Sequence, residues 1–209
     1  MKPKENQSPV EFWEEVYANA SPRTKGQPSA ALARFASDRL PGHALELGCA
    51  KGDDAVWLAN MGWMVVAVDI SSTALSYAGA NAQAHGVFGK INFQQHDLTH
   101  SFPEGEFDLV SAMFLQTPFE FARETVLRQA ASSLKKGGLF LAVTHGSRPS
   151  WSWDKANTSF PPPQKRFQDL GLIPTHWREV FVGNEERVAS GPDGQQGAIT
   201  DTIVCLERC

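Results

Sequence analysis

The sequence predicts an α/β protein with a doubly wound, mostly parallel sheet of seven strands. Between residues 43 and 144, short apolar segments alternate with segments of helical periodicity, which is the pattern of a parallel sheet flanked by helices. After residue 174 the pattern changes to two extended segments joined by a polar turn, which predicts a C-terminal antiparallel hairpin at the sheet edge. The 209 residues are long enough to form one domain, 1–209, around one core.

The first forty residues predict a helical cap on this domain. Apolar side chains recur at helical spacing in residues 10–19 and in residues 29–40, and Pro41-Gly42 ends the second helix. Leu40 is among the residues expected to be buried by that second helix. We therefore describe residues 1–40 as an N-terminal helical cap.

The alternating elements follow in order. Trp63 to Val68 is apolar throughout, as expected for a strand buried on both faces, and Gly62 and Gly86 end the helices on either side of it. The predicted strands cover residues 43–47, 63–68, 91–95, 107–112 and 139–144. The predicted helices cover residues 53–61, 71–85 and 119–134.

The pattern becomes irregular after residue 145. Residues 146–164 contain two tryptophans and three consecutive prolines, so we expect a lid-like insertion here. A short helix (164–170) then precedes extended segments at 174–189 and 198–207, with the turn at 191–197.

Composition bounds the function classes. The formal net charge of −4 and the lack of a basic run argue against a nucleic-acid partner. Three cysteines without metal-like spacing indicate a reducing compartment. A polar N-terminus and the lack of any stretch of about 20 apolar residues predict a cytoplasmic protein that is neither exported nor inserted into a membrane.

The segment Glu46-Leu47-Gly48-Cys49-Ala50-Lys51-Gly52 is the most informative part of the sequence. It joins a predicted strand to a predicted helix, where glycines let the backbone approach a ligand and the helix offers unpaired N–H groups. Glu46 would repel a phosphate but attract an ammonium group. Asp69 ends the next strand, where an acid can accept hydrogen bonds from both ribose hydroxyls. This combination favours the amino-acid end of S-adenosylmethionine over a dinucleotide.

Other ligands fit the sequence less well. The glycines that an NAD site requires are missing after Gly48, no Gly-Lys-Ser/Thr follows, and Asp53 with Asp54 would repel a pyrophosphate. His96, Asp97 and His100 could suggest a metal, but neighbouring residues at a strand end rarely point at one ion. We therefore predict no metal site.

Five segments resemble the class I S-adenosylmethionine-dependent methyltransferases, which have a Rossmann-like fold. They are ALELGCAKG at 44–52, VVAVDIS at 65–71, QHDL at 95–98, FDLVSA at 107–112 and LKKGGLFLAV at 134–143. By this resemblance, Glu46 and the backbone near Gly48 hold the methionine amino group, Asp69 holds the ribose, and Ile70, Asp97 and Leu98 surround the adenine. The cofactor-binding set it implies is Glu46, Gly48, Cys49, Ala50, Gly52, Asp69, Ile70, Asp97, Leu98, Ala112 and Met113. The sequence departs from the family at Ala50, where the family has a glycine.

The N-terminal helix is similar to that of small-molecule methyltransferases of the tellurite-resistance and thiopurine type. The resemblance implies that Trp13 and Tyr17 close over the cofactor. Aromatic side chains that merely dock an amphipathic helix on the core are the alternative interpretation. Asp97, likewise, is either an adenine ligand or a polar turn residue.

Methyl transfer mainly needs alignment of the nucleophile and exclusion of water, so no catalytic triad is expected. His145, at the end of the last parallel strand, is the candidate general base; a polar residue satisfied by its loop is the alternative. Gln116, Thr117, Arg148, Trp151 and Trp153 are candidates for the substrate-binding site. The sequence thus predicts methyl transfer to a small molecule by a monomer or homodimer. A non-catalytic S-adenosylmethionine sensor and a nicotinamide-dependent oxidoreductase are the alternatives.

Overall fold

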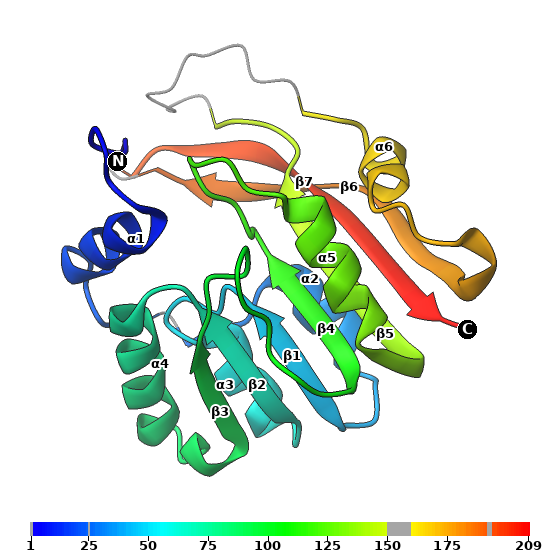
Figure 1. Ribbon diagram of the computed structural model, residues 1–209, viewed down its shortest axis with the longest axis horizontal. Coiled ribbons are helices and arrows are strands. Elements are labelled where there is room, and N and C mark those ends of the chain that lie inside the picture. The colour runs from blue at the N-terminus through cyan, green and yellow to red at the C-terminus, as the bar shows by residue number, and fades with distance from the viewer. Residues whose placement is uncertain (1, 25, 150–159, 192–193) are drawn as a thin grey trace.

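A seven-stranded sheet in the order β3-β2-β1-β4-β5-β7-β6 forms the centre of the protein (Figure 1). The structure is a computed structural model and describes residues 2–24, 26–149, 160–191 and 194–209. Strands β1 to β5 run parallel, whereas β7 pairs antiparallel with both β5 and β6. The strands are β1 (His43–Leu47), β2 (Met64–Asp69), β3 (Ile91–Gln95), β4 (Phe107–Met113), β5 (Leu134–His145), β6 (Trp177–Ser190) and β7 (Gln196–Arg208). The predicted parallel sheet with a terminal hairpin is confirmed.

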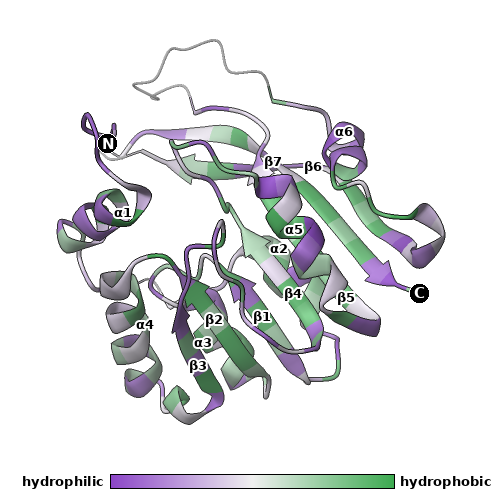
Figure 2. Ribbon diagram, in the orientation of Figure 1, coloured by the Kyte–Doolittle hydropathy of each residue, from purple (hydrophilic) through white to green (hydrophobic). Residues whose placement is uncertain are grey.

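Helices pack on both faces of this sheet. One buried cluster joins the sheet to α2, α3 and α4, and a second joins the opposite face to α5, with α6 at its margin. Figure 2 shows the strands at the centre of the sheet, such as β2, β1 and β4, as largely hydrophobic, whereas much of α1 and α6 is hydrophilic. The helices are α1 (Pro9–Ala18), α2 (Ala30–Ala36), α3 (Asp53–Asn60), α4 (Ser72–Ala84), α5 (Arg123–Ser132) and α6 (Pro163–Asp169), with short 3₁₀ turns at Phe88–Lys90 and Pro174–His176.

Three predicted boundaries differ from the observed ones by four residues or more. Helix α2 ends at Ala36 rather than at residue 40, and Leu40 is 91% exposed rather than buried. Helix α5 begins at Arg123 rather than at residue 119, because Phe119 packs edge-on against Phe12 of α1 in the preceding loop. Strand β5 begins at Leu134 rather than at residue 139, because Leu134 already pairs with Phe107.

The order of the strands places the candidate site. Strands β1 and β4 are neighbours, so the connections leaving them diverge toward opposite halves of the sheet. Ligands of doubly wound sheets bind in the crevice at this point, beyond the carboxyl ends of the strands. Residues 150–159, which contain most of the predicted lid, lie outside the described residues. In the described part of the chain, no helix has the length and apolar character needed to cross a membrane.

Candidate active site

The loop between β1 and α3 follows a path that restricts which residues it can contain. Gly48, Ala50 and Gly52 have φ angles of 72°, 50° and 81°, all in the left-handed region that favours glycine. The N–H groups of Gly48 and Cys49 both donate to the Val68 carbonyl oxygen, at 2.9 and 2.8 Å. A Cβ atom on Gly52 would lie 2.9 Å from the Cβ of Ala78 in α4. The loop is therefore fixed against β2 on one side and α4 on the other.

Ala50 has a left-handed φ of 50° without being a glycine. Such a conformation costs an L-residue with a Cβ atom about 1–2 kcal/mol. This geometry explains why the methyltransferases that the sequence resembles have glycine here. The departure at Ala50 therefore concerns the backbone, which has a conformation that glycine would adopt more readily.

The Ala50→Gly variant is accordingly expected to be more stable than the wild type, by about 0.5–1 kcal/mol in the free energy of unfolding. The relieved strain exceeds the added entropy of the unfolded chain. Urea denaturation measures the difference, and Ala80→Gly is the matched control. Ala80 is exposed within α4, where the same substitution should cost about 1 kcal/mol. Equal destabilisation by both substitutions would show that Ala50 is not strained.

Asp69 fixes the same loop from the end of β2. One carboxylate oxygen accepts the N–H of Ala50 at 2.9 Å, and the other accepts the N–H of Ser71 at 3.0 Å. Burial raises the pKa of Asp69, although these backbone hydrogen bonds act to lower it. Each oxygen keeps a further lone pair, and Asp69 lines one of the two clefts described below.

Glu46 is the residue whose environment most clearly requires a ligand. It is buried, and its Oε2 atom has no hydrogen-bond partner among the described residues. Burial, followed by the negative charges of Asp54, Asp69 and Asp53, holds the pKa of Glu46 well above its ordinary value. A buried carboxyl group among like charges is destabilising unless a cation or a proton compensates it. The arrangement thus fits a cationic group at Glu46.

Asp53 and Asp54 connect the N-terminal segment to the start of α3. Asp53 accepts the N–H of Gly26 at 3.0 Å, and the two oxygens of Asp54 accept the N–H and the hydroxyl of Ser29. Burial raises the pKa of Asp54. The two aspartates therefore hold the link before α2 in place, beside the predicted cofactor loop.

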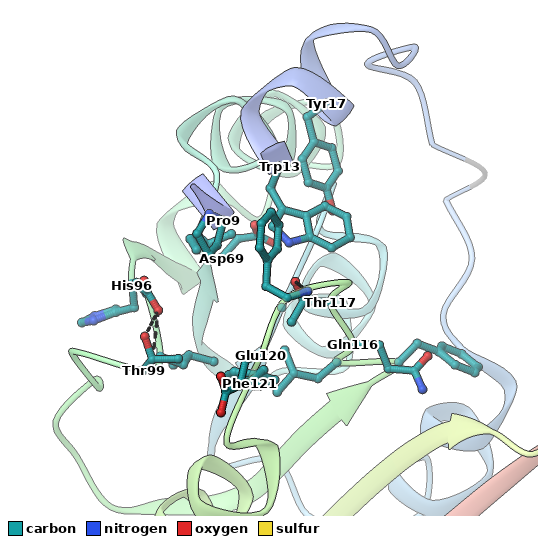
Figure 3. A pocket seen from close by; sticks show the side chains of 17 residues that line it. Pro9, Trp13, Tyr17, Asp69, His96, Thr99, Gln116, Thr117, Glu120 and Phe121 are labelled. Atoms are coloured by element: carbon teal, nitrogen blue, oxygen red, sulfur yellow. Dashed lines mark hydrogen bonds between the residues drawn. The ribbon is translucent and has the colours of Figure 1, made fainter. Parts of the chain in front are cut away.

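Two open clefts meet at the carboxyl end of the sheet, and they hold about 760 Å³ and about 780 Å³ of space that is partly open to solvent. We call them the aromatic cleft and the acidic cleft. The aromatic cleft (Figure 3) is lined by Pro9, Trp13, Tyr17, Gly48, Asp69, Ile70, His96, Asp97, Leu98, Thr99, Phe114, Leu115, Gln116, Thr117, Phe119, Glu120 and Phe121. The acidic cleft is lined by Tyr17, Gln27, Pro28, Ser29, Glu46, Gly48, Cys49, Ala50, Lys51, Asp53, Asp54, Met113 and Phe114. Tyr17, Gly48 and Phe114 line both, so the two clefts adjoin.

Most of the predicted site residues line these clefts. Gly52 and Ala112 are exceptions, because neither lines a cleft. Gly52 allows the left-handed turn of the loop, and Ala112 is buried in β4. His145 lines neither cleft but stacks on Phe114, with ring centroids 4.6 Å apart. Arg148 does not line either cleft. Trp151 and Trp153 lie outside the described residues.

The Asp97 carboxylate makes its hydrogen bonds within its own turn. It accepts the N–H and hydroxyl of Thr99, at 3.0 and 2.6 Å, and Nδ1 of His100 lies 3.1 Å away. Burial raises the pKa of Asp97, but the hydrogen bonds from Thr99 and His100 outweigh burial and lower it. Because Asp97 also lines the aromatic cleft, its turn role does not preclude contact with a ligand.

Sequence reasoning missed Glu14, which docks α1 over the aromatic cleft. Its carboxylate accepts the hydroxyl of Ser71 at 3.1 Å and the N–H groups of Ser72 and Thr73 at 2.6 and 3.2 Å. Burial raises the pKa of Glu14, but the hydrogen bonds from Thr73 and Ser72 outweigh burial and lower it to about 2. The first turn of α4 has no acidic residue of its own, a possible sequence signal that an acid from elsewhere would bind there.

Phe114 is the second residue that sequence reasoning missed. It follows β4 with a left-handed φ of 55°, and its N–H donates to the Val143 carbonyl oxygen at 2.8 Å. Strained backbone of this kind in a non-glycine residue gathers at functional sites. Phe114 forms the wall shared by the two clefts and by His145.

Part of the chain is similar to a known protein family. Residues 44–138 match the methyltransferase domain family. The ribosomal RNA small subunit methyltransferase C of Alcanivorax borkumensis is 29% identical over 120 residues, which cover 54% of this chain and 35% of that protein. The chain spans between 35% and 59% of the length of the curated relatives it matches.

Solved structures share the fold. One structure comes from work on the conversion of a disulfide bond into a thioacetal group during echinomycin biosynthesis. It has a TM-score of 0.70 and 22% sequence identity, and the match covers 95% of this chain and 91% of that chain. The N-methyltransferase NodS of Bradyrhizobium japonicum in complex with S-adenosyl-L-homocysteine has a TM-score of 0.62 and 16% identity, and covers 97% and 89%. Residues 44–138 of this chain are thus similar to a methyltransferase domain, and the whole sheet has the fold of these solved structures.

Proposed function

We propose that this protein transfers the methyl group of S-adenosylmethionine to a small-molecule acceptor. The observation that carries the proposal is the buried Oε2 of Glu46, which has no hydrogen-bond partner in the described part of the chain. An ammonium group at this point would satisfy the orphaned oxygen and offset the charges of the neighbouring aspartates. A dinucleotide phosphate at the same point would add a negative charge to them.

The methionine end and the nucleoside of the cofactor occupy different clefts. Glu46 and the backbone at Gly48 hold the methionine end in the acidic cleft, while Asp69 holds the ribose in the aromatic cleft. Ile70, Leu98 and Asp97 surround the adenine, and Trp13 with Tyr17 covers it. Burial, followed by the charge of Asp69, raises the pKa of Tyr17, so its hydroxyl stays a hydrogen-bond donor. The cofactor supplies a methyl group already activated by a sulfonium sulfur, and the chain orients it and excludes water.

One relative is a ribosomal RNA methyltransferase, so the class of acceptor is inferred from the charge of this chain. The net charge of −4 and the acids Asp69, Asp97 and Glu120 in the aromatic cleft favour a small molecule over a polyanion. We assign Gln116, Thr117 and Arg148 to the acceptor side, with Trp151 and Trp153 of the insertion. Cytoplasmic location, a monomeric or dimeric state and the likeness to the tellurite-resistance and thiopurine group remain predictions.

Calorimetry with S-adenosyl-L-homocysteine tests the cofactor assignment. The wild type is expected to bind, and Asp69→Asn is expected to weaken binding about 100-fold, because hydrogen bonds to a charged group contribute about 1.5–3 kcal/mol each. The asparagine side chain keeps one oxygen for the loop, so the variant should fold. Asp108→Asn is the matched control: Asp108 bonds to His43 and Lys135 at the opposite end of the sheet, so this variant should bind normally.

Three outcomes would contradict the proposal. They are no binding by the wild type at millimolar ligand, unchanged affinity in Asp69→Asn, or a preference for NAD. Binding without methyl transfer to any member of a broad acceptor panel would favour the non-catalytic sensor instead.

A further inference from the structure

A buried carboxylate lies beside His145 on the neighbouring strand of the sheet. Asp201 of β7 is the direct cross-strand neighbour of His145 at the end of β5. Asp201 is buried, whereas the His145 side chain is 44% exposed. Nδ1 of His145 lies 3.7 Å from Oδ1 of Asp201, an ion-pair distance that is longer than a hydrogen bond. Catalytic hydrogen bonds are often long before ligands bind and tighten in the complex.

Two further side chains join this pair to the cofactor clefts. Arg187 of β6 donates from Nε to the other oxygen of Asp201 at 2.5 Å. Its guanidinium lies 5.6 Å from the ring centroid of Phe114, and Phe114 in turn stacks on His145. Phe114 lines both clefts, so the imidazole stacks on a ring that belongs to the wall of the cofactor site.

The charged side chains near this pair come from the hairpin and from α2. Asp201 and Arg187 come from the hairpin, and Glu185, the other cross-strand neighbour of Asp201, pairs with Arg34 of α2. Burial raises the pKa of Asp201, but its contacts with His145 and Arg187 outweigh burial and lower it. Asp201 is therefore a carboxylate at neutral pH, although it is buried.

This arrangement determines what the imidazole can do. A carboxylate opposite Nδ1 favours the tautomer that carries its proton on Nδ1, which leaves Nε2 free to accept another. We propose that Asp201 is a positioning residue that holds His145 to accept a proton from the methyl acceptor. The inference rests on the proposed methyl transfer, and it assigns the acceptor class: a neutral hydroxyl, amine or thiol that loses a proton during the reaction.

The atoms and charges of that step balance. The acceptor atom uses a lone pair to form a bond to the methyl carbon while the bond from carbon to sulfur breaks. The electron pair of the broken bond stays on sulfur. The proton of the acceptor moves to Nε2 of His145. The positive charge that leaves the sulfonium thus reappears on the imidazolium, beside the ionised Asp201.

Nitrogen-15 NMR of the imidazole tests the positioning role without an acceptor. At about pH 9, where an ordinary imidazole is neutral, the wild type should show His145 mainly in its Nδ1-protonated form, with the signal assigned by its loss in His145→Gln. In Asp201→Asn, the Nδ1-protonated form should cease to be the majority species. Arg187→Gln is the matched control and should keep it. A wild type that is mainly Nε2-protonated, or an unchanged distribution in Asp201→Asn, would overturn the proposal.

Two further measurements separate this inference from the proposed function. Asp201→Asn should bind S-adenosyl-L-homocysteine with an affinity within about twofold of that of the wild type, because Asp201 lines neither cleft. If the wild type does not bind this ligand, the proposed function is refuted, whereas the tautomer result is not affected. With phenol, aniline and thiophenol as probes, any acceptor that the wild type methylates should show kcat lowered roughly 10–100-fold in Asp201→Asn, with KM nearly unchanged. An equal loss of kcat with iodide, which has no proton to give, would contradict the proton-accepting role.

Discussion

Glu46→Gln is expected to stabilise the ligand-free protein and at the same time to weaken S-adenosyl-L-homocysteine binding roughly 10–100-fold. The two effects have one cause. The Glu46 carboxyl is buried among three aspartates, which disfavours its ionised form, yet that ionised form is what an ammonium group needs. Glutamine keeps the shape of the side chain and removes the charge.

The pH dependence of the two effects has a defined sign. Folding raises the pKa of Glu46 above its ordinary value of 4.5, so its favourable contribution to stability is complete below about pH 4.5 and is lost as the pH rises through the higher folded pKa. The stability advantage of Glu46→Gln should therefore grow over that interval. Wild-type affinity should fall as the carboxyl becomes protonated at lower pH, whereas the affinity of the variant should not show this dependence.

Thermal unfolding and calorimetry between about pH 4 and 8 measure both quantities. Glu106→Gln is the matched control, because Glu106 is exposed just before β4, at the other end of the sheet. It should change neither quantity. If Glu46→Gln destabilises the free protein, the carboxyl has a partner that compensates its charge, and the cation site at Glu46 is wrong.

Glu14→Gln is expected to lower the free energy of unfolding at pH 7 by about 1–3 kcal/mol and to accelerate the dissociation of S-adenosyl-L-homocysteine. The glutamine oxygen can still accept hydrogen bonds, but it loses the charge that favours the start of α4. Helix α1 then docks less firmly, and with it Trp13 and Tyr17, which line the aromatic cleft.

The pH dependence of the stability change in Glu14→Gln is opposite to that in Glu46→Gln. Folding lowers the pKa of Glu14 from 4.5 to about 2, so its contribution is present above about pH 4.5 and is lost as the pH falls toward 2. The difference between wild type and Glu14→Gln should shrink over that interval. Urea denaturation measures stability and stopped-flow tryptophan fluorescence measures dissociation. Glu15→Gln, which removes a contact with Lys4 on the outer side of α1, should leave the dissociation rate unchanged.

The sequence predicted the sheet well because buried parallel strands leave a local signature. The bounds of β1 (His43–Leu47) and β3 (Ile91–Gln95) are the predicted ones. Gly42 and Gly48 lie on either side of β1, and Ile91 and Phe93 alternate with polar residues in β3. The loop at 48–52 could also be predicted from the sequence, because left-handed backbone restricts which residue types can occupy its positions. Asp69 was placed beside this loop by topology alone, as the strand order confirms.

The missed residues act through contacts that no local pattern encodes. Glu14 meets Ser72 from 58 positions away, and Asp201 meets His145 only because the hairpin inserts β7 beside β5. Phe119 and Phe121 were read as helical, whereas they line the aromatic cleft from the loop before α5. In each case the partner lies on an element far along the chain, so the periodicity around the residue carries no information about it.

The attachment of α1 also sets the order in which the protein can be assembled. The three donors that bind Glu14 lie 57 to 59 positions after it in the sequence. A ribosome releases α1 first, but its docking site at the start of α4 exists only after β2 and α4 have been made and packed. Until then Phe12, Trp13 and Tyr17 are exposed on a short helix that is marginal alone. Helix α1 is thus synthesised before its docking site and can be placed only after α4 has folded, so chaperone dependence should concentrate on the segment that contains α1.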